Sequence, residues 1–190
     1  MFQLKVICIT LSLALLCGLS HADIVYDESV DGDLSNFESS PTAVTLAEGG
    51  NQLLGTIGGT SNPNIGDGFD SLVISIGANQ TLTQIIINDY QVSGGNTSTG
   101  VNIFTSSGTF LGSVAMNTSD VGSDLLRLTG AGQLGPGDYR ISLREFTAPG
   151  QTYDFSFVVV VPEPVQAGGV VLFLTWLIFP RNRRRFHGGV

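Results

Sequence analysis

Short segments in which apolar and polar residues alternate run through the chain from residue 42 to residue 161. The clearest lies at 138–146, where Tyr139, Ile141 and Leu143 fall on one side and the residues between them fall on the other. A period of two is that of a β-strand with one buried face. The same pattern, together with enrichment in Val, Ile, Thr and Phe, predicts strands at 42–48, 51–57, 70–76, 82–88, 101–105, 109–114, 124–129, 138–146 and 152–161.

Clusters of Gly, Asn, Asp and Ser separate these segments at intervals of roughly 8–12 residues. Between the two ends of the chain, no segment has the apolar spacing of an amphipathic helix. We therefore predict an all-β fold of eight or nine strands, a β-sandwich or jelly roll of two packed sheets without helices. A Gly-Pro-Gly turn at 135–137 leads into 138–146, which we expect to form a final hairpin with 152–161.

The first 22 residues are typical of a secretory signal peptide. Lys5 supplies a positive charge, residues 6–16 form an apolar run, and Ser20 and Ala22 place small residues before a cut at Asp23. This pattern predicts export through the Sec translocon. Both cysteines of the chain lie upstream of the cut, so the exported protein is expected to contain no disulfide.

The other end of the chain begins with a segment that excludes helix and continues into an apolar one. Pro162, Glu163 and Pro164 come first, and each proline fixes its own φ and restricts the residue before it. Residues 165–179 (VQAGGVVLFLTWLIF) carry no charge, and we expect them to form a transmembrane helix. Fifteen helical residues span about 22 Å against a hydrocarbon core of about 30 Å, so arginine snorkelling and local thinning must cover the difference.

An arginine cluster follows this apolar segment: Arg181, Arg183, Arg184 and Arg185. Positive charges next to a membrane span stay in the cytoplasm, which places residues 23–161 outside. The signal peptide predicts the same topology independently.

The order of Pro-Glu-Pro, short apolar helix and arginine cluster resembles a PEP-CTERM sorting signal, here over residues 162–185. The resemblance implies that an exosortase in the inner membrane of a bacterium recognises the tail. It implies cleavage near Pro162, Glu163 and Pro164, retention by the arginines, and release to the cell surface or an extracellular polysaccharide matrix. The tail departs from the family pattern at Pro180 and in residues 186–190, which follow the cluster.

The central segment 23–161 is acidic and lacks most catalytic side chains. It carries fifteen Asp and Glu against three Arg, a formal charge of −12, which argues against binding to nucleic acid. It contains no His, Cys, Lys or Trp, which excludes serine triads, cysteine nucleophiles, histidine-bound metals and lysine Schiff bases. Carboxylate chemistry remains, either a glycosidase-like pair of acids or a calcium site, although nothing in the sequence singles out such a pair.

Two groups of aspartates are candidate calcium ligands: Asp27, Asp31 and Asp33 in one turn, and Asp67 with Asp70 in the other. Carboxylates spaced by glycine can converge on a hard cation, but Asp, Asn and Gly are also the commonest turn residues. Several turn-and-strand features resemble pre-peptidase C-terminal-like β-sandwich domains, a resemblance that implies a fold and no activity. They are residues 26–29, 31–36, 49–56 and 135–140.

We therefore expect a non-enzymatic exported protein of the cell surface or extracellular matrix that is the substrate of an exosortase. Three alternatives stay open at this point. The domain is a carbohydrate-binding module of the exopolysaccharide matrix that stacks sugars on exposed aromatic residues, or a hydrolase that uses two carboxylates. In the third alternative, the helix is never cut and remains a permanent anchor.

Overall fold

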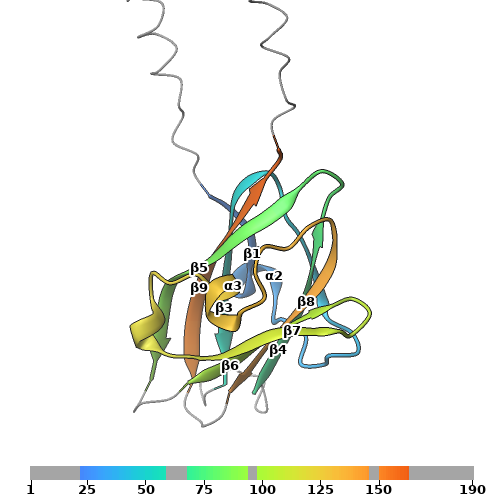
Figure 1. The fold of residues 1–190 in the computed structure, drawn as a ribbon. Coiled ribbons are helices and arrows are strands. Elements are labelled where there is room, and N and C mark those ends of the chain that lie inside the picture. Colours follow the sequence, from blue (N-terminus) through green and yellow to red (C-terminus); the bar gives the residue numbers. More distant parts are fainter. Residues whose placement is uncertain (1–21, 59–67, 94–97, 146–149, 163–190) are drawn as a thin grey trace, which may run out of the picture.

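The structure is a computed structural model that describes residues 22–58, 68–93, 98–145 and 150–162. It confirms the all-β prediction: two sheets pack face to face as a β-sandwich (Figure 1). Sheet A has the order β1-β3-β9-β5 and consists of β1 (Asp23–Asp27), β3 (Gly49–Ile57), β9 (Gln151–Val160) and β5 (Thr81–Val92). Sheet B has the order β2-β4-β8-β6-β7 and consists of β2 (Thr42–Thr45), β4 (Phe69–Ile76), β8 (Gly137–Glu145), β6 (Thr99–Thr105) and β7 (Phe110–Met116).

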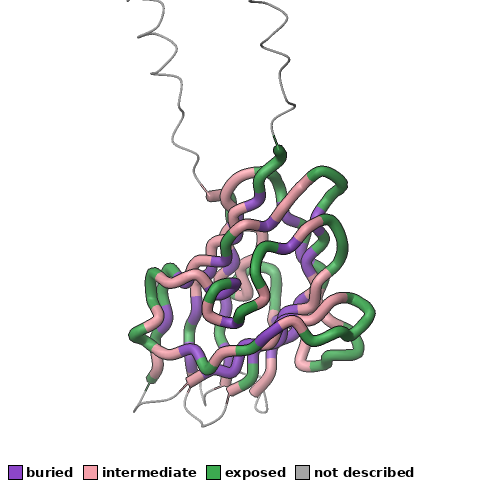
Figure 2. Tube along the Cα trace, in the orientation of Figure 1, coloured by how far each residue is buried: buried purple, intermediate pink, exposed green. Residues whose placement is uncertain are grey.

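The core is formed by the alternate residues of each strand that face the opposite sheet. In β9, for example, Phe155 and Phe157 are buried while Ser156 and Val158 between them are only partly covered. The tube in Figure 2 shows the same alternation along the strands. This domain contains no cysteine and therefore no disulfide. The main stabilising contribution is the burial of apolar side chains, which adds about 25 cal/mol of free energy per Å² of apolar surface removed from water.

The prediction of a strand at 124–129 is wrong, because Leu125–Thr129 forms the short helix α3. The Asp124 side chain accepts a hydrogen bond from the Leu126 N–H at 3.0 Å, and Gly130 ends the helix with a left-handed φ of 77°. A helical turn buries Leu125 and Leu126 together, whereas a strand would place these neighbours on opposite faces.

The expected final hairpin is also wrong, because β8 and β9 lie in different sheets. β8 pairs with β4 and β6 in sheet B, and β9 pairs with β3 and β5 in sheet A. Each strand thereby gains a partner on both sides. Two further short helices contradict the expected absence of helix: α2 (Glu28–Asp31) and the 3-10 turn η1 (Thr118–Asp120).

The register of sheet A places the first and last described strands so that both termini leave the same end of the sandwich. Asp23 at the start of β1 lies beside Asn51, which pairs with Phe157 near the end of β9. Figure 1 shows both ends at the top of the view. At the opposite end, the last residues of β3 and β5, Ile57 and Val92, meet Gln151 at the start of β9. Ten residues of β9 separate the two ends by about 30 Å.

Most of the predicted signal peptide and sorting tail lies outside the described residues. Of the sites predicted there, the structure describes Ala22, Asp23, where β1 begins, and Pro162, which follows the last strand. Within the described ranges, no helix has the length and apolar character needed to cross a membrane.

Candidate functional site

Helix α2 follows β1 in the half of the sandwich away from the termini, and it holds two of the predicted calcium ligands: Asp27 is its N-cap and Asp31 its last residue. Asp27 accepts hydrogen bonds from the backbone N–H and the hydroxyl of Ser29, at 2.9 and 2.7 Å. Asp31 accepts one from the Asp27 N–H at 2.9 Å. Both carboxylates therefore satisfy donors that a helix start leaves without a partner inside the helix. The structure assigns these two aspartates to capping and does not place them in the acidic cluster below.

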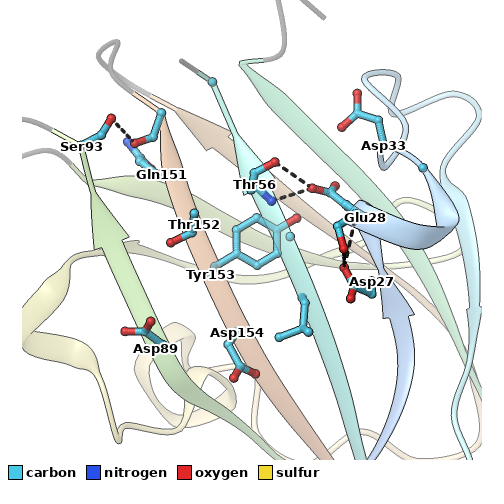
Figure 3. Close-up of a pocket in the computed structure, with 16 residues that line it drawn as sticks. Asp27, Glu28, Asp33, Thr56, Asp89, Ser93, Gln151, Thr152, Tyr153 and Asp154 are labelled. Carbon is cyan, nitrogen blue, oxygen red and sulfur yellow. Dashed lines mark hydrogen bonds between the residues drawn. The ribbon is translucent and has the colours of Figure 1, made fainter. Parts of the chain in front are cut away.

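Glu28 points from α2 toward β3 and connects the two elements (Figure 3). One carboxylate oxygen accepts from the Leu34 N–H at 3.0 Å, and the other accepts from the N–H and the hydroxyl of Thr56. Burial raises the pKa of Glu28, the backbone donors oppose this, and the negative charge of Asp33 adds to the rise. Glu28 therefore has a structural role, and the negative charge of Asp33 disfavours its ionised form.

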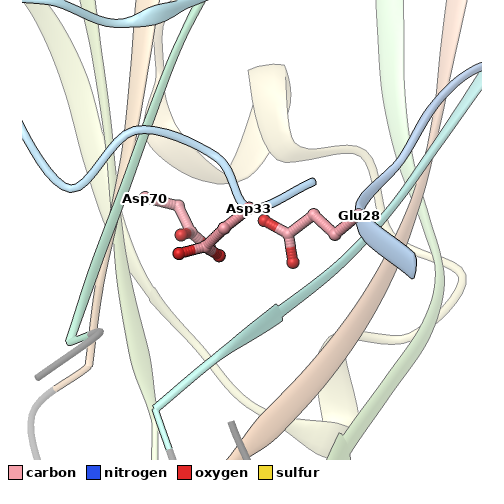
Figure 4. A group of neighbouring side chains, drawn as sticks. All are labelled: Glu28, Asp33 and Asp70. Atoms are coloured by element: carbon pink, nitrogen blue, oxygen red, sulfur yellow. The ribbon is translucent and has the colours of Figure 1, made fainter. Parts of the chain in front are cut away.

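Glu28, Asp33 and Asp70 form an acidic cluster, with one oxygen from each lying within 4.8 Å of the others (Figure 4). Asp70 is the second residue of β4, is fully buried, and accepts a hydrogen bond from the Tyr153 hydroxyl of β9 at 2.7 Å. The pKa of nearby Tyr26 is raised by burial first and then by the surrounding acids, these three among them. Three converging carboxylates are oxygen ligands that suit a hard cation such as calcium, which binds oxygens at about 2.3–2.6 Å.

A pocket of about 730 Å³ lies beside this cluster, at the same end of the sandwich. Its wall includes Asp89 of β5 and Asp154 of β9 in addition to acids of α2 and the following turn. Asp154 is held in place by the amides of Gln52 and Asn88, at 2.8 and 2.9 Å. Carboxylates and hydroxyls therefore share the lining of the pocket with Leu54, Tyr153 and several glycines. The described part of the chain contains no His, Cys or Lys to add a nucleophile or base.

The predicted calcium ligands have thus separated into three groups. Asp33 and Asp70 come together, Asp27 and Asp31 cap α2, and Asp67 lies outside the described residues. Sequence reasoning missed Glu28, although it belongs to the same acid-rich turn, because nothing in the sequence shows which side chain of that turn faces β4. Calcium binding by the cluster remains a prediction.

Comparison with known proteins gives little beyond the architecture. No protein-family model matches the chain, and no curated protein matches it. Among solved structures, the chain is similar to the pre-peptidase C-terminal domain of a collagenase from Bacillus anthracis. The identity is 12%, the TM-score is 0.38, and the match covers 64% of this chain and 98% of that one. No activity or ligand is transferred from a likeness of this size.

Proposed function

We propose that this chain is an exported, non-enzymatic protein of the bacterial cell surface or extracellular matrix. On this proposal the β-sandwich is the cargo, and the tail from Pro162 onward is a sorting signal that an exosortase recognises and cuts. The observation that carries the proposal is the order of the C-terminal segment. Pro-Glu-Pro, fifteen uncharged residues and an arginine cluster follow the last strand of the sandwich.

The geometry of the sandwich supports delivery by a tail. Both ends of the described domain lie on the same side of the sandwich. With a membrane helix that begins after Val161, the opposite end of the sandwich would point away from the membrane. That opposite end carries the pocket and the acidic cluster. β9 is about 30 Å long, and its first four residues line the pocket.

The side chains of the domain support a role without catalysis. Two carboxylates of the pocket already accept hydrogen bonds on both oxygens. Asp154 accepts from two side-chain amides, and Glu28 accepts from two backbone N–H groups. Segment 23–161 supplies no His, Cys or Lys that could work with these carboxylates as a nucleophile or base. A net charge of −12 in segment 23–161 keeps such a domain soluble at a cell surface and suits association with cations.

The test is mass spectrometry of the protein recovered from intact cells of a host that contains an exosortase. We expect an N-terminus at Asp23 and a C-terminus between residues 161 and 165. In a host that lacks the exosortase, peptides that contain Trp176 should remain. Trp176-containing peptides in the mature product of both hosts would contradict processing and favour a permanent anchor.

A further inference from the structure

The four edge strands of the sandwich differ in how they are protected. The free side of β5 is covered by the segment after η1: Leu82 and Leu134 exchange two backbone hydrogen bonds, and Ile87 bonds to Ser123 and Gly122. β2 has only four residues. β1 has an aspartate at each end and a register shift in its centre. Short length, charge and irregular pairing are the usual protections against edge-to-edge association.

β7 lacks most of these protections. It forms the edge of sheet B, and within the described part of the chain its ladder partner is β6. Its seven residues (FLGSVAM) include no charge and no proline. A bulge at Leu111 leaves Gly112–Met116 as a regular edge of five residues, and the end of α3 packs against Gly112 at its start. Unpaired N–H and C=O groups on such an edge are a template for another strand.

The sequence on either side of β7 is also uncharged. From Tyr90 to Ser119 the sequence holds thirty consecutive residues without a charged side chain, in a domain with a formal charge of −12. That stretch contains the whole β6–β7 hairpin. On the outer face, the row through Phe110 continues into Phe104 and then Arg140, which forms an ion pair with Glu38 at 3.3 Å.

An exposed aromatic residue begins the same strand. Phe110 is 56% exposed, and its ring packs edge-on against Phe104 with 5.5 Å between the ring centres. The Arg140 guanidinium lies 4.5 Å from the centre of the Phe104 ring. Ser113 and Ala115, farther along β7, are also exposed. A rigid apolar side chain beside an open edge is typical of the anchor of a protein–protein contact.

We propose that β7 pairs antiparallel with β7 of a second copy of this chain, which joins the two B sheets across a two-fold axis. A second copy is the occupant that the charges favour. Two copies of a domain with a formal charge of −12 repel each other wherever their acidic side chains meet. β7 is an edge strand without acidic side chains. An antiparallel strand pair is self-complementary, so one surface serves both copies. The inference does not depend on the proposed function, because it concerns the sandwich alone.

The test uses single cysteines in the full chain with Cys8→Ala and Cys17→Ala, which has no other thiol. Ala115→Cys and Ser113→Cys place a thiol on the exposed face of β7, and Ala43→Cys places one on β2, the opposite edge of the same sheet. After mild oxidation in detergent, we expect a disulfide-linked dimer from at least one β7 variant and monomer from Ala43→Cys. Equal cross-linking from both strands, or none from β7, would overturn the inference.

A charge variant gives an independent readout. Ala115→Lys places two lysines near each other across the two-fold axis, and Ala43→Lys is the matched control. In sedimentation of the full chain in detergent, Ala115→Lys should weaken dimerisation by about tenfold or more, and Ala43→Lys should not. Circular dichroism checks that both variants fold, and Ser113→Lys replaces Ala115→Lys should the latter unfold. A wild-type chain that stays monomeric at all concentrations, or a dimer unaffected by lysine on β7, would refute the proposal, with export left untouched.

Discussion

The hydrogen bond from Tyr153 to Asp70 connects the two sheets, and its removal is the most informative perturbation of the candidate site. The hydroxyl and the carboxylate oxygen are 2.7 Å apart, and the two residues are 3% and 0% exposed. Tyr153→Phe deletes this donor and keeps the ring, which stacks on Phe155 with 5.0 Å between centres. The loss of a hydrogen bond to a buried acidic group should lower the free energy of unfolding by about 2–3 kcal/mol.

Tyr90→Phe is the matched control, because Tyr90 also connects the two sheets but bonds to neutral groups. Its hydroxyl donates to Gln151 at 2.8 Å and lies 3.0 Å from the Thr99 hydroxyl, which itself contacts the same Gln151 oxygen. Since that oxygen keeps the Thr99 donor, we expect a loss of about 1 kcal/mol.

Urea denaturation of segment 23–161 measures both variants. With a slope of about 2 kcal/mol per molar urea, Tyr153→Phe should lower the midpoint by about 1–1.5 M and Tyr90→Phe by about 0.5 M. Equal midpoints for the two variants, or a smaller effect of Tyr153→Phe, would refute the reasoning that the acidic partner makes the Tyr153 bond the stronger one.

Three further predictions concern packing, pH and metal. Gly112→Ala should destabilise the domain by about 1–3 kcal/mol, because its methyl group would collide with a backbone carbonyl at the end of α3, whereas Gly135→Ala has open space and should be close to neutral in thermal denaturation. Burial raises the pKa of Glu145, so the folded state binds its proton more tightly than the unfolded state. The free energy of unfolding should therefore rise as pH falls through that raised pKa toward the lower pKa of the unfolded chain, and Glu145→Gln should remove this part of the pH dependence. Calcium should raise the melting temperature of the wild type and of Asp89→Asn, which lies outside the cluster, but not of Asp33→Asn; an unchanged wild-type melting temperature would count against a calcium site.

The sandwich was predictable because its strands alternate between apolar and polar residues. In β8, Ile141 and Leu143 are buried as the pattern indicates, although Ser142 between them is buried as well. Residues 125–129 did not follow, since five residues are too few for the apolar spacing to distinguish a strand from a helix, and the cap by Asp124 depends on a local hydrogen bond. The hairpin of 138–146 with 152–161 failed because proximity in sequence does not decide which sheet a strand joins.

The acidic cluster shows a similar limit. The acid-rich turn and the Asp70 segment were both visible in the sequence, but their meeting requires β4 and α2 to face one another across the end of the sandwich. Only that arrangement selects Asp33 for the cluster and leaves Asp27 to cap the helix. A residue such as Glu28, which joins α2 to β3, is identified by its partners and not by its position in a motif.

The central claim is that the segment after Val161 inserts into a membrane and delivers the domain to the outside. Alkaline extraction of membranes that hold the uncut precursor tests it directly, with a chain truncated after Val161 as the control. We predict that the precursor stays in the membrane pellet and that the truncated chain enters the supernatant. A full-length precursor found in the supernatant would contradict membrane insertion and, with it, the proposed sorting.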